Sequence, residues 1–187
     1  LIIMDGIAHN PSDVGNAVSA ARTPTLDHLL AHYPSTEIAT FGPRVGLLGE
    51  QMGNSEVGHL NIGAGRVVEQ DLTRIHNAIE KGELGKLPEM RGLIETVKGH
   101  PGSALHLIGL VSLGGVHSHL SHLEALISEA ASSGVKHIFV HAITDGRDRP
   151  PTVAVEEVGL LQKFIEKTRA EYPHIDLGIS TIIGRYF

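Results

Sequence analysis

The stretch that decides the fold is Ala104-Leu-His-Leu-Ile-Gly-Leu-Val111, which continues as Ser-Leu-Gly-Gly-Val-His-Ser-His119. A short apolar run that gives way to a glycine-rich polar segment is typical of a buried strand and the loop after it. Residues 121–132 then carry leucine and isoleucine on one helical face. Strand, loop and helix in this order predict a unit of a parallel sheet.

The same order returns further along the chain. Residues 137–143 predict a second strand, 144–151 a polar loop, 153–169 a helix and 175–183 a third strand. We therefore predict an α/β fold of mostly parallel sheets with covering helices. The carboxyl ends of parallel strands meet at one edge, so the chemistry is expected in the loops there.

In the N-terminal part the predicted strands and helices do not alternate in this way. It predicts strands at 1–4 and 33–39 and helices at 24–31, 55–62, 71–81 and 89–98. We expect parts of two domains: residues 1–70, the N-terminal part of one, and residues 71–187, part of a second. Both ends of the sequence look cut, because it begins in mid-strand without Met and stops just after an apolar run.

Composition narrows the class of protein. The 187 residues are 41% hydrophobic and 19% charged, which is a globular composition. The net charge of -6 without a basic stripe argues against nucleic acid and membrane surfaces as partners. No apolar run is long enough to span a bilayer. The absence of cysteine excludes disulfides and thiolate zinc sites and fits a reducing compartment, so we expect a cytoplasmic protein.

The most informative segment is Gln51-Met-Gly-Asn-Ser55-Glu-Val-Gly-His59-Leu-Asn-Ile-Gly-Ala-Gly65-Arg66. Ser55 at a helix N-terminus lies beside free N–H groups that suit a phosphate or an alkoxide. The position of Ser55 alone fits a simple helix N-cap better than a catalytic nucleophile. No His or Lys neighbour is an obvious base, so activation would need a metal. Asp5, after the first strand, is a fitting ligand for a hard divalent cation, or a surface residue of a turn.

Polar residues also follow each later strand. His117, His119 and His122 could bind zinc or copper, or could hydrogen-bond a carboxylate or phosphate. A helix-surface role is favoured for His122.

The next two loops carry charged residues. Arg147 and Asp148 read equally well as an anion clamp beside a general base and as a structural ion pair. Arg185, after the third strand, could bind another phosphate.

These segments resemble a known family. Gln51 to Arg66 looks like the nucleophile motif of the 2,3-bisphosphoglycerate-independent phosphoglycerate mutases, members of the alkaline phosphatase superfamily. Gly114-Gly-Val-His117-Ser-His119 and His141-Ala-Ile-Thr-Asp145-Gly-Arg-Asp148-Arg-Pro-Pro151 resemble two of its substrate loops, and Ile183-Gly-Arg-Tyr186 the start of a third. They occur in the family's order, over the whole sequence.

The resemblance implies a two-domain enzyme, phosphatase-like and transferase, that interconverts 3-phosphoglycerate and 2-phosphoglycerate at two divalent ions. Mn²⁺ is expected, with Mg²⁺ or Co²⁺ as alternatives. Ser55 would be the nucleophile and a metal ligand, and Asp5 another ligand. The remaining residues would bind substrate: Asn54, His117, Arg147, Asp148 and Arg185. Asp148 could also accept a proton from the glycerate hydroxyl. We expect a monomeric whole protein.

This sequence departs from the family's pattern at several positions, and these departures bear on whether the chain alone can be active. Arg149 stands where Thr is common, and the family's later Asp and His metal ligands, its Lys and its second arginine are absent from these residues. Two metal ligands do not hold a dinuclear site. The chain is therefore expected to be an incomplete, inactive fragment of a mutase. The alternatives are another metal-dependent phosphomutase or phosphatase of the superfamily, and a non-catalytic phosphate- or metal-binding module.

Overall fold

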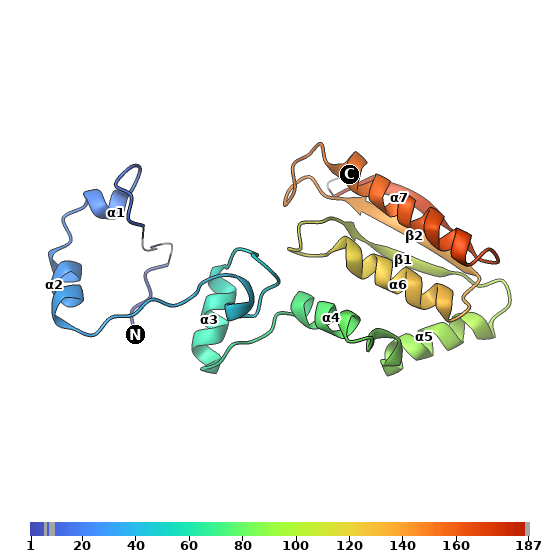
Figure 1. Cartoon of the computed structure of the whole chain (residues 1–187), viewed down its shortest axis with the longest axis horizontal. Coiled ribbons are helices and arrows are strands. Elements are labelled where there is room, and N and C mark those ends of the chain that lie inside the picture. Colours follow the sequence, from blue (N-terminus) through green and yellow to red (C-terminus); the bar gives the residue numbers. More distant parts are fainter. Residues whose placement is uncertain (6, 8–9, 186–187) are drawn as a thin grey trace.

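The computed structural model describes residues 1–5, 7 and 10–185. Its C-terminal part is a three-stranded sheet in the order β1-β2-β3, formed by β1 (Leu105–Val111), β2 (His137–Thr144) and β3 (Asp176–Gly184). Both pairings are parallel, as the repeated strand and helix pattern predicts. Figure 1 shows the three strands running side by side, with all three carboxyl ends at one end of the sheet. The α/β prediction is confirmed.

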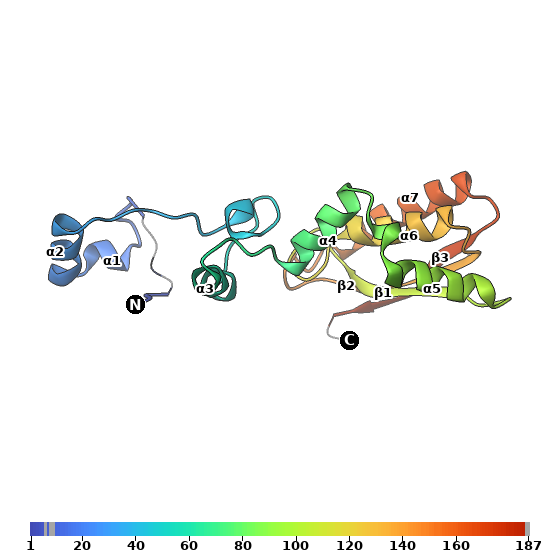
Figure 2. The same cartoon turned by 90° about the horizontal axis from the view of Figure 1, so that it is seen from below.

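Two helices cover one face of this sheet (Figures 1 and 2). α6 (Leu120–Ser132) packs on β1 and β2, and α7 (Ala154–Glu171) packs on β2 and β3. Along β2, alternate residues are buried, which is the period expected of a strand with one covered face. Ile138 and Val140 from that strand form a common core with Ile127 of α6 and Leu161 of α7.

The middle of the chain is helical, as its apolar spacing predicts. α4 (Asp71–Glu80) lies against α6, and α5 (Pro88–Gly99) adds Met90 and Ile94 to the core of the sheet unit. A short 3-10 turn, η2 (Leu84–Lys86), joins these two helices.

The segment that carries Ser55 has a small core of its own. η1 (Gly42–Val45) and α3 (Ser55–Ala64) meet there, and Val45, Leu47 and Val57 are buried together. Gly46 has φ +85° and lies so close to the Val68 carbonyl that a Cβ could not be added without movement. Its own carbonyl accepts a 2.8 Å hydrogen bond from the Thr73 hydroxyl. This glycine therefore lets the chain fold back tightly enough to join η1 to α4.

In the N-terminal part the predicted helix at 24–31 is confirmed, whereas the two predicted strands are not found. Residues 10–40 contain the helices α1 (Ala17–Ala20) and α2 (Pro24–His32) and lie apart from the sheet in both views (Figures 1 and 2). The strands predicted at 1–4 and 33–39 are absent, and residues Leu1 and Ile2 are 101% and 89% exposed. A strand needs a neighbour for its backbone hydrogen bonds, and no described segment lies beside either run to supply one.

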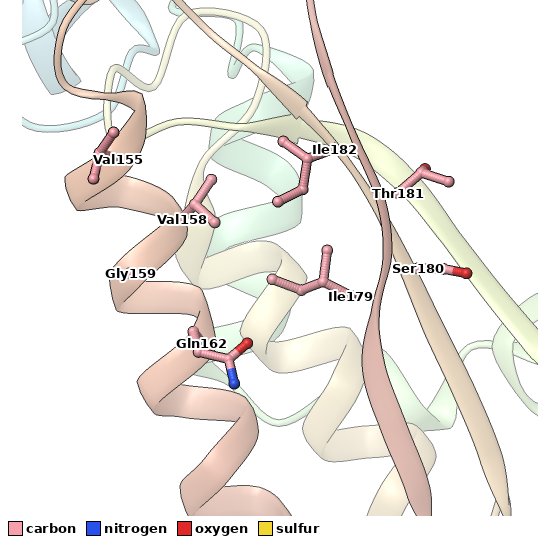
Figure 3. A pocket seen from close by; sticks show the side chains of 8 residues that line it. All are labelled: Val155, Val158, Gly159, Gln162, Ile179, Ser180, Thr181 and Ile182. Atoms are coloured by element: carbon pink, nitrogen blue, oxygen red, sulfur yellow. The ribbon is translucent and has the colours of Figure 1, made fainter.

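An open apolar groove runs between α7 and the outer strand β3. Figure 3 shows Val155 and Val158 of the helix across from Ile179 and Ile182 of the strand. The groove has a volume of about 560 Å³. Its polar lining is limited to Gln162, Ser180 and Thr181, so it offers no charged group for catalysis.

Candidate functional site

The polar loops meet where the sequence predicts, at the carboxyl ends of the strands. Asp145, the residue directly after β2, organises this edge and is buried. Its Oδ1 accepts N–H bonds from Gly146, Arg147 and Asp148 at 2.8, 3.0 and 3.0 Å. One carboxylate oxygen therefore shapes the whole turn that presents the Arg147 and Asp148 side chains.

Asp145 also joins this turn to the loops on either side. Its Oδ2 accepts a 2.8 Å bond from the Ser112 hydroxyl, directly after β1. Its Oδ1 lies 3.2 Å from Arg185 Nη1, directly after β3. The side chain thus spans all three strand ends. Burial opposes ionisation, but the N–H groups of Arg147, Asp148 and Gly146 and the Ser112 hydroxyl hold the Asp145 pKa far below its usual value.

Three of the candidate substrate residues come together here. Arg185 Nη1 lies 2.6 Å from Asp148 Oδ2, and His117 Nε2 lies 3.7 Å from the same oxygen. The hydrogen bond to Asp148 raises the pKa of Arg185, so its guanidinium stays charged. The sequence suggested no role for Asp145, although an Asp-Gly pair at a strand end is a recognisable turn signal.

Arg147 is the fourth candidate substrate residue at this edge, and its side chain is not paired in the way that of Arg185 is. Its backbone is held by Asp145, while its side chain is exposed and makes no hydrogen bond or ion pair to any described residue. With Arg185 already paired to two carboxylates, Arg147 is the cation of this cluster that is free to meet an anion.

Ser55 and Asn54 lie on a separate element. Asn54 is the N-cap of α3, and its Oδ1 accepts a 3.0 Å bond from the Val57 N–H. Ser55 is exposed at the first position of that helix, as predicted. Within the described part of the chain, no hydrogen bond or ion pair connects Ser55 to the loops at the strand ends.

His59 is a neighbour of Ser55 that the sequence prediction missed. Its Nδ1 lies 3.2 Å from the Ser55 hydroxyl oxygen and 2.7 Å from the Ser55 carbonyl oxygen. The shorter contact to an acceptor-only oxygen requires that Nδ1 carry the proton. His59 in this tautomer cannot take the proton from the Ser55 hydroxyl. The spacing of four residues on a helix could have indicated the contact.

The metal ligands are not assembled in the described residues. Asp5 is exposed in the N-terminal segment and makes no hydrogen bond or ion pair within the described chain. Among residues 1–5, 7 and 10–185, no group of three or more His, Asp or Glu side chains converges on a point that could hold a metal ion. Asp5 and Ser55 offer suitable oxygens but do not form a site by themselves.

A smaller pocket lies between the two halves. It has a volume of about 270 Å³ and brings Gly49 and Gln51 opposite Gly114, Gly115 and His119. The loop that precedes Ser55 therefore borders the glycine-rich loop that carries His117.

Three histidines cluster beside this pocket. The ring of His122 lies 5.7 Å from that of His76 and 5.9 Å from that of His119. Burial and then the neighbouring imidazoles lower the pKa of His122, and burial and then His76 lower that of His119. The Nε2 of His122 is buried without a partner. The geometry favours neutral imidazoles packed between α4 and α6. The helix-surface role expected for His122 is therefore wrong, because the packing of α4 against α6 buries this side chain.

This cluster predicts acid sensitivity. The unfolded chain binds protons at His119 and His122 near pH 6.5 and the folded chain only at lower pH, so protonation favours unfolding. We expect the free energy of unfolding to be highest above pH 6.5 and to fall as the pH drops below that value. Urea denaturation of the His122→Gln variant should show a smaller fall, whereas replacement of the exposed His100 should not change it. An equal fall in the wild type and the His122 variant would contradict the assignment.

Comparisons with known proteins follow this geometry. Residues 75–187 match a family model described as "BPG-independent PGAM N-terminus". The chain is 49% identical over 187 residues to 2,3-bisphosphoglycerate-independent phosphoglycerate mutase 1 of Methanosarcina barkeri, and 51% identical over 189 residues to the 2,3-bisphosphoglycerate-independent phosphoglycerate mutase of Methanococcoides burtonii. Each alignment covers 100% of this chain and 35% of the relative.

A solved structure shows the same likeness. The chain superposes on Leishmania mexicana phosphoglycerate mutase, crystallised at low cobalt concentration, with a TM-score of 0.77 and 37% identity. The superposition covers 99% of this chain and 34% of that one. The chain therefore spans about a third of the length of the proteins it matches. None of the helices in the described residues is long and apolar enough to cross a membrane.

Proposed function

The chain belongs to the family of 2,3-bisphosphoglycerate-independent phosphoglycerate mutases, and from this premise we propose that the whole protein interconverts 3-phosphoglycerate and 2-phosphoglycerate. The observation that carries the proposal is the meeting of His117, Asp148 and Arg185 at one edge of the sheet, with the side chain of Arg147 free. A phosphoglycerate has a carboxylate and a phosphate, so it needs cationic partners and a hydrogen-bonding group for its hydroxyl.

Residues 1–70 and 71–187 are proposed to contribute to two domains of the whole protein, the first phosphatase-like and the second substrate-binding. In this arrangement Ser55 and Asn54 act from one side and the strand-end cluster from the other. The pocket between Gln51 and Gly114 supports such a meeting, because it already joins a segment of each part.

The proposed chemistry is phosphoryl transfer through Ser55. The Ser55 hydroxyl loses its proton and its oxygen forms a bond to phosphorus, as the bond from phosphorus to the 3-oxygen of the glycerate breaks and the departing oxygen takes up a proton. The 2-hydroxyl then loses its proton and its oxygen forms a bond to phosphorus, as the bond from phosphorus to the Ser55 oxygen breaks and that oxygen takes up a proton. Asp148 is proposed to accept the proton that the 2-hydroxyl loses. Asn54 is proposed to donate a hydrogen bond to the transferring group, and Arg147, with His117 and Arg185, to hold the glycerate.

Metal ions are part of the proposal only at the level of ligands. Two divalent ions, with Mn²⁺ favoured, would neutralise phosphate charge in the whole protein. Asp5 and Ser55 are proposed as two of their ligands. No step is derived through these ions, because the described residues do not form a complete site. We further propose that the whole protein is a monomeric cytoplasmic enzyme.

A coupled assay of the whole protein tests the function. We expect 2-phosphoglycerate to form from 3-phosphoglycerate without added 2,3-bisphosphoglycerate, and a chelator to stop the reaction. Faster turnover of sugar phosphates would favour another phosphomutase of the superfamily, and release of inorganic phosphate a phosphatase. Calorimetric binding of phosphoglycerate without turnover would favour a non-catalytic module.

A further inference from the structure

Glu157 is a buried carboxylate to which the proposed reaction gives no role. It lies in the first turn of α7, and its side chain is 1% exposed. Further along the same helix, Leu161 and Ile165 belong to the apolar core. Burying a carboxylate costs free energy unless the carboxylate is paired and hydrogen-bonded. The partners of Glu157 therefore indicate its role.

Its partners come from two different loops. Glu157 Oε1 accepts a 3.1 Å bond from the Leu113 N–H and a 3.0 Å bond from Arg149 Nε. Leu113 opens the loop that carries His117, and Arg149 directly follows Asp148 in the next loop. One oxygen of an α7 side chain therefore ties the loop after β1 to the loop after β2.

The Arg149 side chain strengthens this tie by packing. A Cβ placed on Gly114 would lie 3.3 Å from Arg149 Cγ and 3.4 Å from its Cδ. The arginine stem thus lies across the backbone of the His117 loop, and its guanidinium turns to Glu157. The other oxygen of Glu157, Oε2, is buried and has no hydrogen-bond partner among the described residues.

The geometry points to Glu157 and Arg149 as positioning residues: we propose that this pair sets the distance between His117 and the Arg147–Asp148 turn. The proposal rests on the proposed function, since His117, Arg147 and Asp148 are side chains that would bind the glycerate. Asp145 fixes the same two loops at the strand ends, through Ser112 and its own turn. Glu157 fixes them on the helix side, so removing it lets the loops move apart while the sheet edge stays tied.

Kinetics of the whole protein test the pair. Glu157→Gln keeps an acceptor oxygen but loses the charge, and Arg149→Met keeps much of the stem over Gly114 but loses the donor. We expect each variant to raise KM for 3-phosphoglycerate by about tenfold, with a smaller change in kcat. Because both remove the same tie, the double variant should be no worse than the worse single one. Arg149→Lys, which keeps the charge, should restore part of the loss.

Thr168→Val is the matched control. Thr168 is also buried on α7, but its hydroxyl donates to the Phe164 carbonyl of its own helix. This variant should lower stability without a change in KM. Amide hydrogen exchange gives a second readout: the Leu113 N–H should exchange faster in Glu157→Gln than in the wild type or Thr168→Val.

The outcomes separate the two proposals. Unchanged KM and unchanged Leu113 exchange in both single variants would overturn the pair's role, as would losses that multiply in the double variant. If the wild type does not turn over phosphoglycerate, the proposed function fails, and the tie is still judged by hydrogen exchange. If Glu157→Gln does not fold, the Arg149 variants decide, because that side chain is partly exposed.

Discussion

Replacing Ser55 by Ala in the whole protein is expected to lower the turnover of 3-phosphoglycerate by at least about 10³-fold. The alanine side chain has no atom that can bond to phosphorus, so the phosphoserine cannot form. The fold should be unaffected, because the N-cap bond of α3 comes from Asn54 and not from Ser55. A coupled assay and mass spectrometry of phosphorylated protein would measure both consequences.

Ser132→Ala is the control for loss of a helix hydroxyl. Ser132 ends α6, and among the residues that the structure describes its hydroxyl donates only to the Glu129 carbonyl. Its replacement should leave turnover unchanged. Turnover that survives Ser55→Ala would remove Ser55 from its proposed role while leaving the family assignment intact.

The second large effect is expected on stability. Asp145→Asn should lower the free energy of unfolding by about 3 kcal/mol. The amide has no charge to pair with Arg185, and its NH₂ group would face the Ser112 hydroxyl, which now donates to that position. Urea denaturation of the variant and wild type at neutral pH would measure the difference.

The difference in the free energy of unfolding between wild type and Asp145→Asn should become smaller in acid. Because the folded-state pKa of Asp145 is lowered, its contribution to stability is complete above its unfolded value of 3.8 and is lost as the pH falls below that. The gap between wild type and Asp145→Asn should therefore be constant down to about pH 5 and shrink in stronger acid. Asp176→Asn, an exposed carboxylate at the start of β3, should change stability little. Equal effects of the two substitutions would contradict the central place given to Asp145.

The sheet unit could be predicted from the sequence because local and global signals agree there. The apolar run 104–111 ends in glycines, and the apolar face of 121–132 has the helical period. The observed β1 and α6 differ from these ranges by only a residue at their starts. The run at 1–4 carries the same apolar signal, but a strand also depends on a neighbour that a local pattern cannot specify.

The candidate site also has features that the sequence predicts and features that it does not. A parallel sheet dictates that residues after successive strands lie together, so the meeting of His117, Asp148 and Arg185 follows from the topology. Which side chain organises them does not follow, because Asp145 acts through hydrogen bonds to backbone and to Ser112. Glu157 has even less signal, since a glutamate in the first turn of a helix is ordinarily explained by the helix dipole.

The parallel register has a consequence for how the chain folds. Leu105 pairs with Ile138, and Ile138 pairs with Leu177, so every rung of the sheet joins residues that a whole helix separates along the chain. No two strands can form a local hairpin, and each pairing must first close a long loop against its entropy. α6 and α7 can form from local contacts, whereas the strands gain their bonds only when segments distant in the sequence meet. The assembly of the strand-end loops should therefore be among the last and slowest events of folding, observable as hydrogen-exchange protection of these loops that lags behind helix formation in a stopped-flow experiment.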